Sequence, residues 1–115
     1  MIPSGVEIYV ALEPIDMRLS FDRLSGLAKE RVGYDARSGA LFIFFGKRRD
    51  ALKVLFFDGT GMAIFYKRLD RRTFELPRAP SDGARHVEID DAALEALLDG
   101  IALDDPASPP RAKTH

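Results

Sequence analysis

Apolar residues alternate with polar or small residues in several short segments of this chain, a pattern typical of β-strands. Five segments rich in β-branched and aromatic residues predict strands: 6–12, 41–45, 51–57, 62–69 and 86–89. The wholly apolar run LFIFF at 41–45 is typical of a central strand. A further segment, 73–76, is expected to add an edge strand before Pro77. Short polar loops between the strands favour an antiparallel meander.

Two helices are predicted from apolar spacing and from capping residues. The apolar face of the first helix comprises Phe21, Leu24, Leu27, Ala28 and Val32. Ser20 is its expected N-cap, and Gly33 is its expected C-terminal stop. A short second helix is expected between Asp90 as the cap and Gly100 as the stop. The predicted fold class is therefore α+β: an antiparallel β-meander sheet with one helix after the first strand and a short C-terminal helix.

The predicted strand 51–57 does not separate into a polar and an apolar face. Its alternating sets are Leu52, Val54 and Phe56 on one face, and Lys53, Leu55 and Phe57 on the other. A sheet that is apolar on both faces is either strongly bent or covered on its second face.

The length of 115 residues and the 46% hydrophobic content suit one domain, which we expect to span residues 1–103. Residues 104–115 are proline-rich and are expected to form a flexible tail. No apolar stretch approaches the roughly 20 residues of a membrane span, and the N-terminus lacks the pattern of a signal peptide. With no cysteine in the chain, a cytoplasmic location is expected.

The net charge of -1 conceals an uneven distribution of charge along the chain. Segment 44–78 has nine cations and four anions, a net charge of +5, whereas residues 79–115 have three cations and eight anions, a net charge of -5. A basic middle segment suggests an anionic partner. The alternative is an ordinary solvated surface, which is the commoner meaning of such runs.

Residues that could support catalysis are present but do not form a recognisable pattern. Two-metal nucleases need converging carboxylates, yet most aspartates of this chain lie at turns, where aspartate is a turn former. The only histidines, His86 and His115, are too few for a zinc site. The DGTG segment at 58–61 lacks the lysine of a phosphate-binding loop. We therefore expect no catalytic residues, no metal and no cofactor, and a protein that is not an enzyme.

The candidate binding residues gather at one predicted hairpin. Lysine and arginine can neutralise phosphates, and an exposed tyrosine can stack on a base. The candidate residues are Lys47, Arg48, Arg49, Lys53, Tyr66, Lys67 and Arg68. The neighbouring phenylalanines Phe56, Phe57 and Phe65 are more often core residues than a stacking platform.

The order and spacing of several short motifs resemble one family. The motifs are Asp16-Met17-Arg18, Phe21-Asp22, Gly46, Arg49-Asp50, Lys53-Val54-Leu55, Asp58-Gly59 and Phe65-Tyr66-Lys67-Arg68-Leu69. Together they are similar to the accessory protein encoded by the second reading frame of insertion-sequence sixty-six transposons, often called TnpB. The likeness covers residues 2–77, with a weaker echo in the predicted helix near the C-terminus.

The resemblance implies a protein that is encoded beside a separate transposase and is needed for efficient transposition. It brings no catalytic residues with it. The expected function is that of a non-catalytic accessory protein that binds double-stranded DNA, the transposase of the same element, or both, through the basic hairpin. The alternatives are a pure protein-interaction module or homo-oligomeric scaffold, and a nuclease. No membrane partner is expected.

Overall fold

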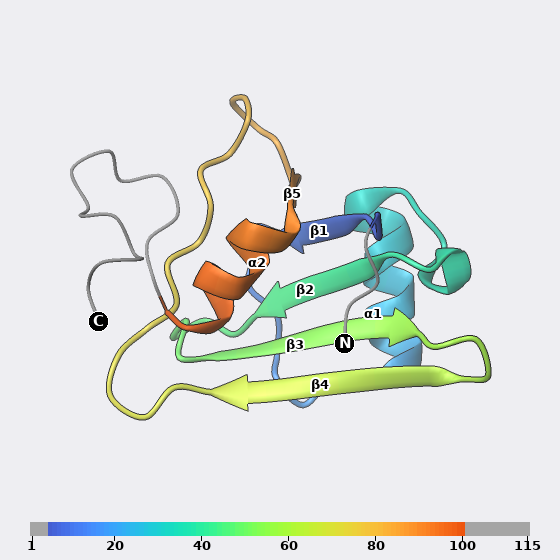
Figure 1. Ribbon diagram of the computed structural model, residues 1–115, viewed down its shortest axis with the longest axis horizontal. Helices are drawn as coiled ribbons and strands as arrows, with labels where there is room; N and C mark the ends of the chain where they lie inside the picture. The colour runs from blue at the N-terminus through green and yellow to red at the C-terminus, as the bar shows by residue number, and fades with distance from the viewer. Residues whose placement is uncertain (1–4, 101–115) are drawn as a thin grey trace.

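A five-stranded mixed sheet forms the centre of the protein (Figure 1). The computed structural model describes residues 5–100. The strands lie in the order β4-β3-β2-β1-β5. Their bounds are β1 Ile8–Ala11, β2 Leu41–Phe45, β3 Ala51–Phe57, β4 Met62–Arg68 and β5 His86–Ile89. All five strands predicted from alternation and residue type are thus present, and the apolar run at 41–45 is the central strand, as expected.

The predicted antiparallel meander is correct for β2, β3 and β4, but it is wrong for β1. Strand β1 pairs with β2 in parallel, with Ile8 opposite Leu41, and with β5 in antiparallel orientation. The long connection between β1 and β2 carries a helix, which is what a parallel pair requires. The sheet is therefore mixed, and its first strand lies between β2 and β5 (Figure 1).

A helical segment covers one face of the sheet. Helix α1 (Phe21–Leu27) continues as one π-helical turn, η1 (Ala28–Val32), and a 3₁₀ turn, η2 (Ala36–Ser38), follows. Ser20 takes the N-cap position, although its hydroxyl makes no capping hydrogen bond, and Gly33 ends the segment with φ 98°. Buried residues from helix and sheet form the first core: Tyr9, Ala11, Ile15, Leu24, Ala28, Val32, Ala36, Ala40, Phe42, Phe44 and Leu55.

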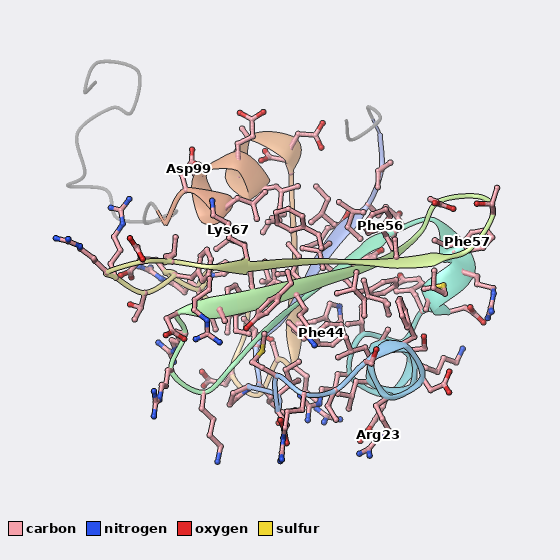
Figure 2. All side chains as sticks on the ribbon, turned by 90° about the horizontal axis from the view of Figure 1, so that it is seen from below. Arg23, Phe44, Phe56, Phe57, Lys67 and Asp99 are labelled. Carbon is pink, nitrogen blue, oxygen red and sulfur yellow. The ribbon has the colours of Figure 1, made fainter. Side chains whose placement is uncertain are left out.

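Helix α2 (Asp91–Leu98) covers the opposite face, so the two helices lie on different sides of the sheet (Figure 2). Asp90 caps it as predicted, because its carboxylate accepts a hydrogen bond from Ala93 N at 2.8 Å. The second core is formed by Ile8, Val10, Leu41, Ile43, Phe45, Leu52, Val54, Phe74, Leu94 and Leu97. Both faces of the sheet are apolar because each is covered by a helix and forms a core.

The predicted edge strand at 73–76 is wrong. This segment forms no strand, and Phe74 is instead a buried anchor whose ring lies 5.8 Å from that of Phe45. The buried ring of Phe74 holds the segment 73–76 against the α2 face of the sheet, although the segment does not pair with any strand. Within residues 5–100, no helix has the length and apolar character needed to cross a membrane. The expected domain boundary at residue 103 and the expected tail, 104–115, lie outside the described residues.

Candidate nucleic-acid interface

The loop between β2 and β3 presents three adjacent cations on a fixed backbone. Arg49 N donates to Gly46 O at 3.0 Å, and Phe74 N donates to Arg49 O at 2.6 Å. Arg49 has φ 60°, a left-handed conformation that tightens the loop. The side chains of Lys47, Arg48 and Arg49 are exposed, and within residues 5–100 none of them makes a hydrogen bond or ion pair. These cations are therefore open to solvent on an ordered loop.

Strand pairing brings a fourth cation to the same end of the sheet. Ala51, the first residue of β3, lies opposite Arg68, the last residue of β4. The Arg68 guanidinium lies 3.3 Å from a carboxylate oxygen of Asp50 and donates to Tyr66 Oη at 2.7 Å. The Tyr66 hydroxyl and Asp50 both raise the pKa of Arg68. We call the four cations Lys47, Arg48, Arg49 and Arg68 the basic rim.

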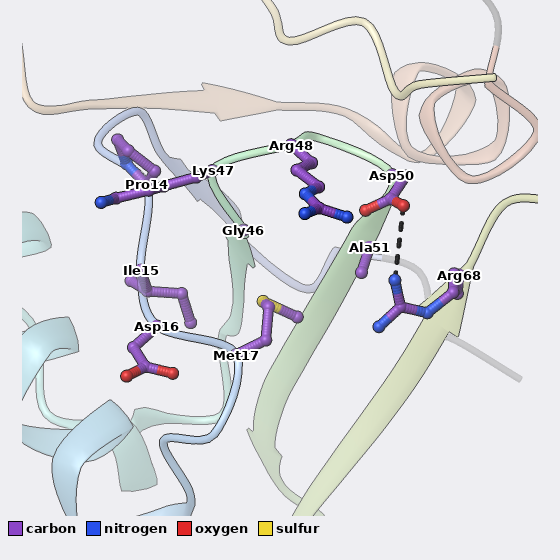
Figure 3. Close-up of a pocket in the computed structure, with 10 residues that line it drawn as sticks. All are labelled: Pro14, Ile15, Asp16, Met17, Gly46, Lys47, Arg48, Asp50, Ala51 and Arg68. Carbon is purple, nitrogen blue, oxygen red and sulfur yellow. Dashed lines mark hydrogen bonds and ion pairs between the residues drawn. The ribbon is translucent and has the colours of Figure 1, made fainter.

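A pocket of about 460 Å³ opens beside the basic rim (Figure 3). Its walls are the segment 14–17, the loop after β2, the start of β3 and Arg68. Arg68 reaches Asp50 across one side of the pocket, and Lys47 extends towards Pro14 on the other (Figure 3). The pocket therefore joins parts of the chain that are distant in sequence.

The carboxylate of Asp16, which also lines the pocket, is neutralised by a neighbour. Arg18 Nη2 lies 2.8 Å from Asp16 Oδ2, Arg18 Nε lies 3.1 Å from Oδ1, and the Arg18 backbone N donates to Oδ1 at 2.9 Å. These hydrogen bonds from Arg18, with a smaller contribution from Lys47, lower the pKa of Asp16 to about 2. Both pocket carboxylates, Asp16 and Asp50, are thus paired with arginines, so this end of the sheet keeps an excess of positive charge.

Lys53, Tyr66 and Arg68 lie on the α1 face of the sheet, and Lys53 is held within the protein. Lys53 Nζ donates to the carbonyl oxygen of Leu19 at 2.8 Å and lies 5.5 Å from the ring centre of Tyr66. Lys53 thereby fastens the loop before α1 to the sheet. Tyr66 is 48% exposed and lies beside Arg68, 5.9 Å from ring centre to guanidinium. Tyr66 adjoins the basic rim, while Lys53 has a structural contact.

Lys67 lies on the other face of the sheet, away from the basic rim. Its Nζ donates to the carbonyl oxygen of Leu98 at 2.7 Å, at the C-terminus of α2. Figure 2 shows its side chain pointing to the side of α2. Arg72 donates to the carbonyl oxygen of Asp99 at 3.1 Å in the same place. Two cations at the C-terminus of a helix stabilise its unpaired carbonyls.

The single surface expected from the sequence is therefore only partly assembled. The structure places Lys47, Arg48 and Arg68 around one pocket, with Tyr66 beside Arg68 and with Arg49 exposed on the same loop as Lys47 and Arg48. It places Lys67 on the opposite face. The pairing of Asp16 with Arg18 was missed by sequence reasoning. The spacing Asp-X-Arg at a predicted chain reversal is a signal for it, because the arginine can fold back on the carboxylate.

Side chains that could bind a metal ion are few and scattered in the described part of the chain. No cluster of three or more His, Asp or Glu side chains within residues 5–100 could hold a metal ion. His86 contacts the Tyr9 ring edge-on, with ring centres 5.8 Å apart. The fold and the site together define a small α+β protein with an exposed basic end beside a pocket.

Comparison with known proteins supplies the family. The model of the IS66 Orf2 like protein family matches residues 6–108. Uncharacterized protein y4hO of Sinorhizobium fredii (strain NBRC 101917 / NGR234) is 40% identical over 103 residues, which cover 88% of this chain and 87% of that protein. Uncharacterized protein y4jC of the same strain is 33% identical over 90 residues, covering 78% and 76%. No solved structure matches this chain.

The chain belongs to the IS66 Orf2 like protein family, so the resemblance seen in its motifs is confirmed. Membership implies an accessory role in the transposition of an insertion sequence. Among the residues that carry the resemblance, Asp16, Met17, Gly46, Asp50 and Arg68 line the pocket.

Proposed function

We propose that this protein is a non-catalytic accessory factor of transposition that binds the phosphate backbone of double-stranded DNA through its basic rim. The observation that carries the proposal is the exposed triplet Lys47, Arg48 and Arg49, whose side chains make no hydrogen bond or ion pair within residues 5–100. Cations that lack internal partners can replace the counterions of a polyanion. Arg68 extends the triplet along the same end of the sheet.

The fixed backbone of the loop supports this proposal. The hydrogen bond from Arg49 N to Gly46 O closes the loop, and the one from Phe74 N to Arg49 O ties the loop to the segment after β4. Only the side chains then lose conformational freedom on binding, which limits the entropic cost. Because phosphate contacts position a protein without selecting a base sequence, binding through the basic rim is expected to be nonspecific and sensitive to salt.

The partner transposase is the second proposed target of the same protein. The exposed aromatic side chains of Phe65 (46% exposed) and Tyr66 (48% exposed) lie on opposite faces of β4. Exposed aromatic residues are typical of protein contacts. An interaction module without DNA binding is therefore the alternative function, and it predicts association with the transposase at high salt and without DNA.

A salt series with matched charge variants tests DNA binding. The affinity for a double-stranded oligonucleotide is measured by fluorescence anisotropy at several salt concentrations. The variant Lys47→Ala/Arg48→Ala/Arg49→Ala should reduce the slope of log K against log salt by about 3, since each phosphate contact contributes about 0.9. The control variant Arg23→Ala/Lys29→Ala/Arg37→Ala removes the same charge from exposed positions elsewhere.

Two outcomes would reject the DNA proposal. One is the absence of binding by the natural sequence at low salt. The other is an equal loss of affinity in both triple variants, which would assign binding to net charge rather than to the basic rim. Co-purification with the transposase at high salt, together with either outcome, would favour the interaction module.

A further inference from the structure

Within residues 5–100, no strand pairs with the outer side of β4, which therefore forms an open edge of the sheet. It is the outermost strand on its side, and all seven of its residues pair with β3 without a bulge. Seen from below, β4 is the nearest strand, with α1 on one side of the sheet and α2 on the other (Figure 2). Open edges in natural proteins are usually protected by proline, bulges or charged side chains, lysine above all. In β4 the charges are confined to the last two residues, Lys67 and Arg68, and the stretch Met62–Tyr66 has none of these devices.

The hydrogen-bond pattern shows which backbone groups face outward. Asp58 N donates to Gly61 O at 3.0 Å, and Leu69 N donates to Asp50 O at 2.8 Å. The residue pairs at the two ends of the β3–β4 hairpin, Asp58 with Gly61 and Asp50 with Leu69, are therefore hydrogen-bonded pairs. Such pairs alternate with non-hydrogen-bonded pairs along an antiparallel ladder. The residues of β4 whose N–H and C=O groups point to the open edge are therefore Met62, Ile64, Tyr66 and Arg68.

We propose that the β4 edge binds a second copy of this chain, strand to antiparallel strand, so that two sheets become one. A twofold arrangement centred on Phe65 pairs all seven residues of β4 and places each outward-facing residue opposite another one. Ile64 then lies opposite Tyr66 of the second copy, and Met62 opposite Arg68. Shifting the centre by one residue in either direction pairs only five residues of the strand.

Charge and side-chain size are compatible with this register. Lys67 lies opposite Ala63 of the second copy, and Arg68 lies opposite Met62, so no like charges face each other directly. The two Phe65 rings meet at the centre, and each is 46% exposed in the single chain. Aromatic cross-strand pairs stabilise sheets, and the open amides gain partners that are protein rather than water. The β4 edge is thus self-complementary.

The pairing would also arrange the proposed DNA-binding surfaces. Arg68 of one copy and Arg68 of the other are separated by six residues along antiparallel strands, or about 20 Å. The two basic rims would stand at opposite ends of one continuous sheet. Pairing of the β4 edges itself does not depend on whether the basic rim binds DNA.

Charge variants at the twofold centre test the register. In the full chain, Phe65→Lys and Phe65→Glu each place like charges opposite each other and should convert the dimer to a monomer in sedimentation equilibrium. An equimolar mixture of the two variants should restore a dimer, and native mass spectrometry should show that it contains one copy of each. Phe65 belongs to neither core, so both variants should keep the fold, as checked by circular dichroism.

Single-cysteine variants give a second measurement, because the natural chain contains no cysteine. Phe65→Cys should form a disulfide-linked dimer on mild oxidation, since paired Cβ atoms across a non-hydrogen-bonded pair lie about 4.5–5.5 Å apart. Ala63→Cys is the control, because the two copies of residue 63 would lie about 13 Å apart along the strands.

A chain that stays monomeric at all concentrations would overturn the proposal, and so would equal cross-linking of both cysteine variants. Monomers that gain protection of the β4 amides only when the transposase is added would assign the edge to a strand of that protein instead. None of these results would alter the outcome of the DNA titration, so the two proposals fail separately.

Discussion

The side chain of Met17 lies against Gly46 so closely that any side chain at position 46 would displace it. A Cβ on Gly46 would stand 2.7 Å from Met17 Cγ and 3.1 Å from Met17 Sδ. A parallel bridge between Ile15 and Gly46 and a hydrogen bond from Ile15 N to Phe45 O, 2.8 Å long, fix the same approach. Glycine at 46 therefore allows the segment before α1 to form one wall of the pocket beside the basic rim.

This contact predicts a coupling between the two residues. Gly46→Ala should lower the free energy of unfolding by about 1–2 kcal/mol, because the added methyl group forces Met17 to move in a packed environment. In a Met17→Ala background the same substitution should cost close to nothing. Urea denaturation of the four proteins of this cycle measures the coupling. An equal cost in both backgrounds would show that the contact does not restrict position 46.

Lys53 is predicted to stabilise the fold more than it assists binding. Lys53→Met keeps the length of the side chain but removes the hydrogen bond to Leu19 O, and it should lower the free energy of unfolding by about 1–2 kcal/mol. Lys47→Met makes the same change at an exposed loop position and should alter stability by less than about 0.5 kcal/mol. Denaturation curves compare the two variants, and equal curves would contradict a tether at Lys53.

Lys67 is predicted to stabilise α2 from the opposite face of the sheet. Lys67→Met removes the cation that bonds Leu98 O and should destabilise the end of α2 by about 1 kcal/mol. Hydrogen exchange of the α2 amides should accelerate in this variant and should be unchanged in Lys47→Met. Unchanged exchange in both variants would show that α2 does not depend on this contact.

The pairing of Asp16 with Arg18 predicts a local pH dependence. The pKa of Asp16 is lowered from 3.8 to about 2, chiefly by hydrogen bonds from Arg18. Because the pKa is depressed in the folded state, the stabilisation is complete above about pH 4 and is lost as the pH falls towards 2. Carboxyl NMR should report this midpoint, and Arg18→Gln should move it back towards 3.8. A midpoint near 3.8 in the natural sequence would contradict the pairing.

Much of the fold could be predicted from local sequence. Alternation and β-branched residues located all five strands, and capping residues located both helix starts, because these features depend on neighbours in the chain. Gly33 and Asp90 end and begin helices as expected. The parallel pairing of β1 was missed, because pairing between distant strands depends on where the intervening helix packs and not on the strand residues themselves.

The segment 73–76 is another place where a tertiary contact overrides the local preference of the sequence. Its residues favour a strand locally, but burial of Phe74 against Phe45 holds the segment across the sheet without pairing. The candidate site also has one part that local sequence predicts and another that depends on tertiary contacts. The sequence located the exposed triplet 47–49, because three charged residues between two apolar strands must lie in a loop. It could not show that Lys53 and Lys67 have carbonyl partners within the protein.

By itself, the sequence determined the strands, the helices, the position of the basic loop and the family, since each depends on residue type and short-range spacing. The tertiary structure alone decided the order of the strands, which cations remain exposed and which residues of β4 turn their backbone groups away from β3. These properties arise from contacts between residues far apart in the chain. Such contacts are fixed only when both faces of the sheet are covered.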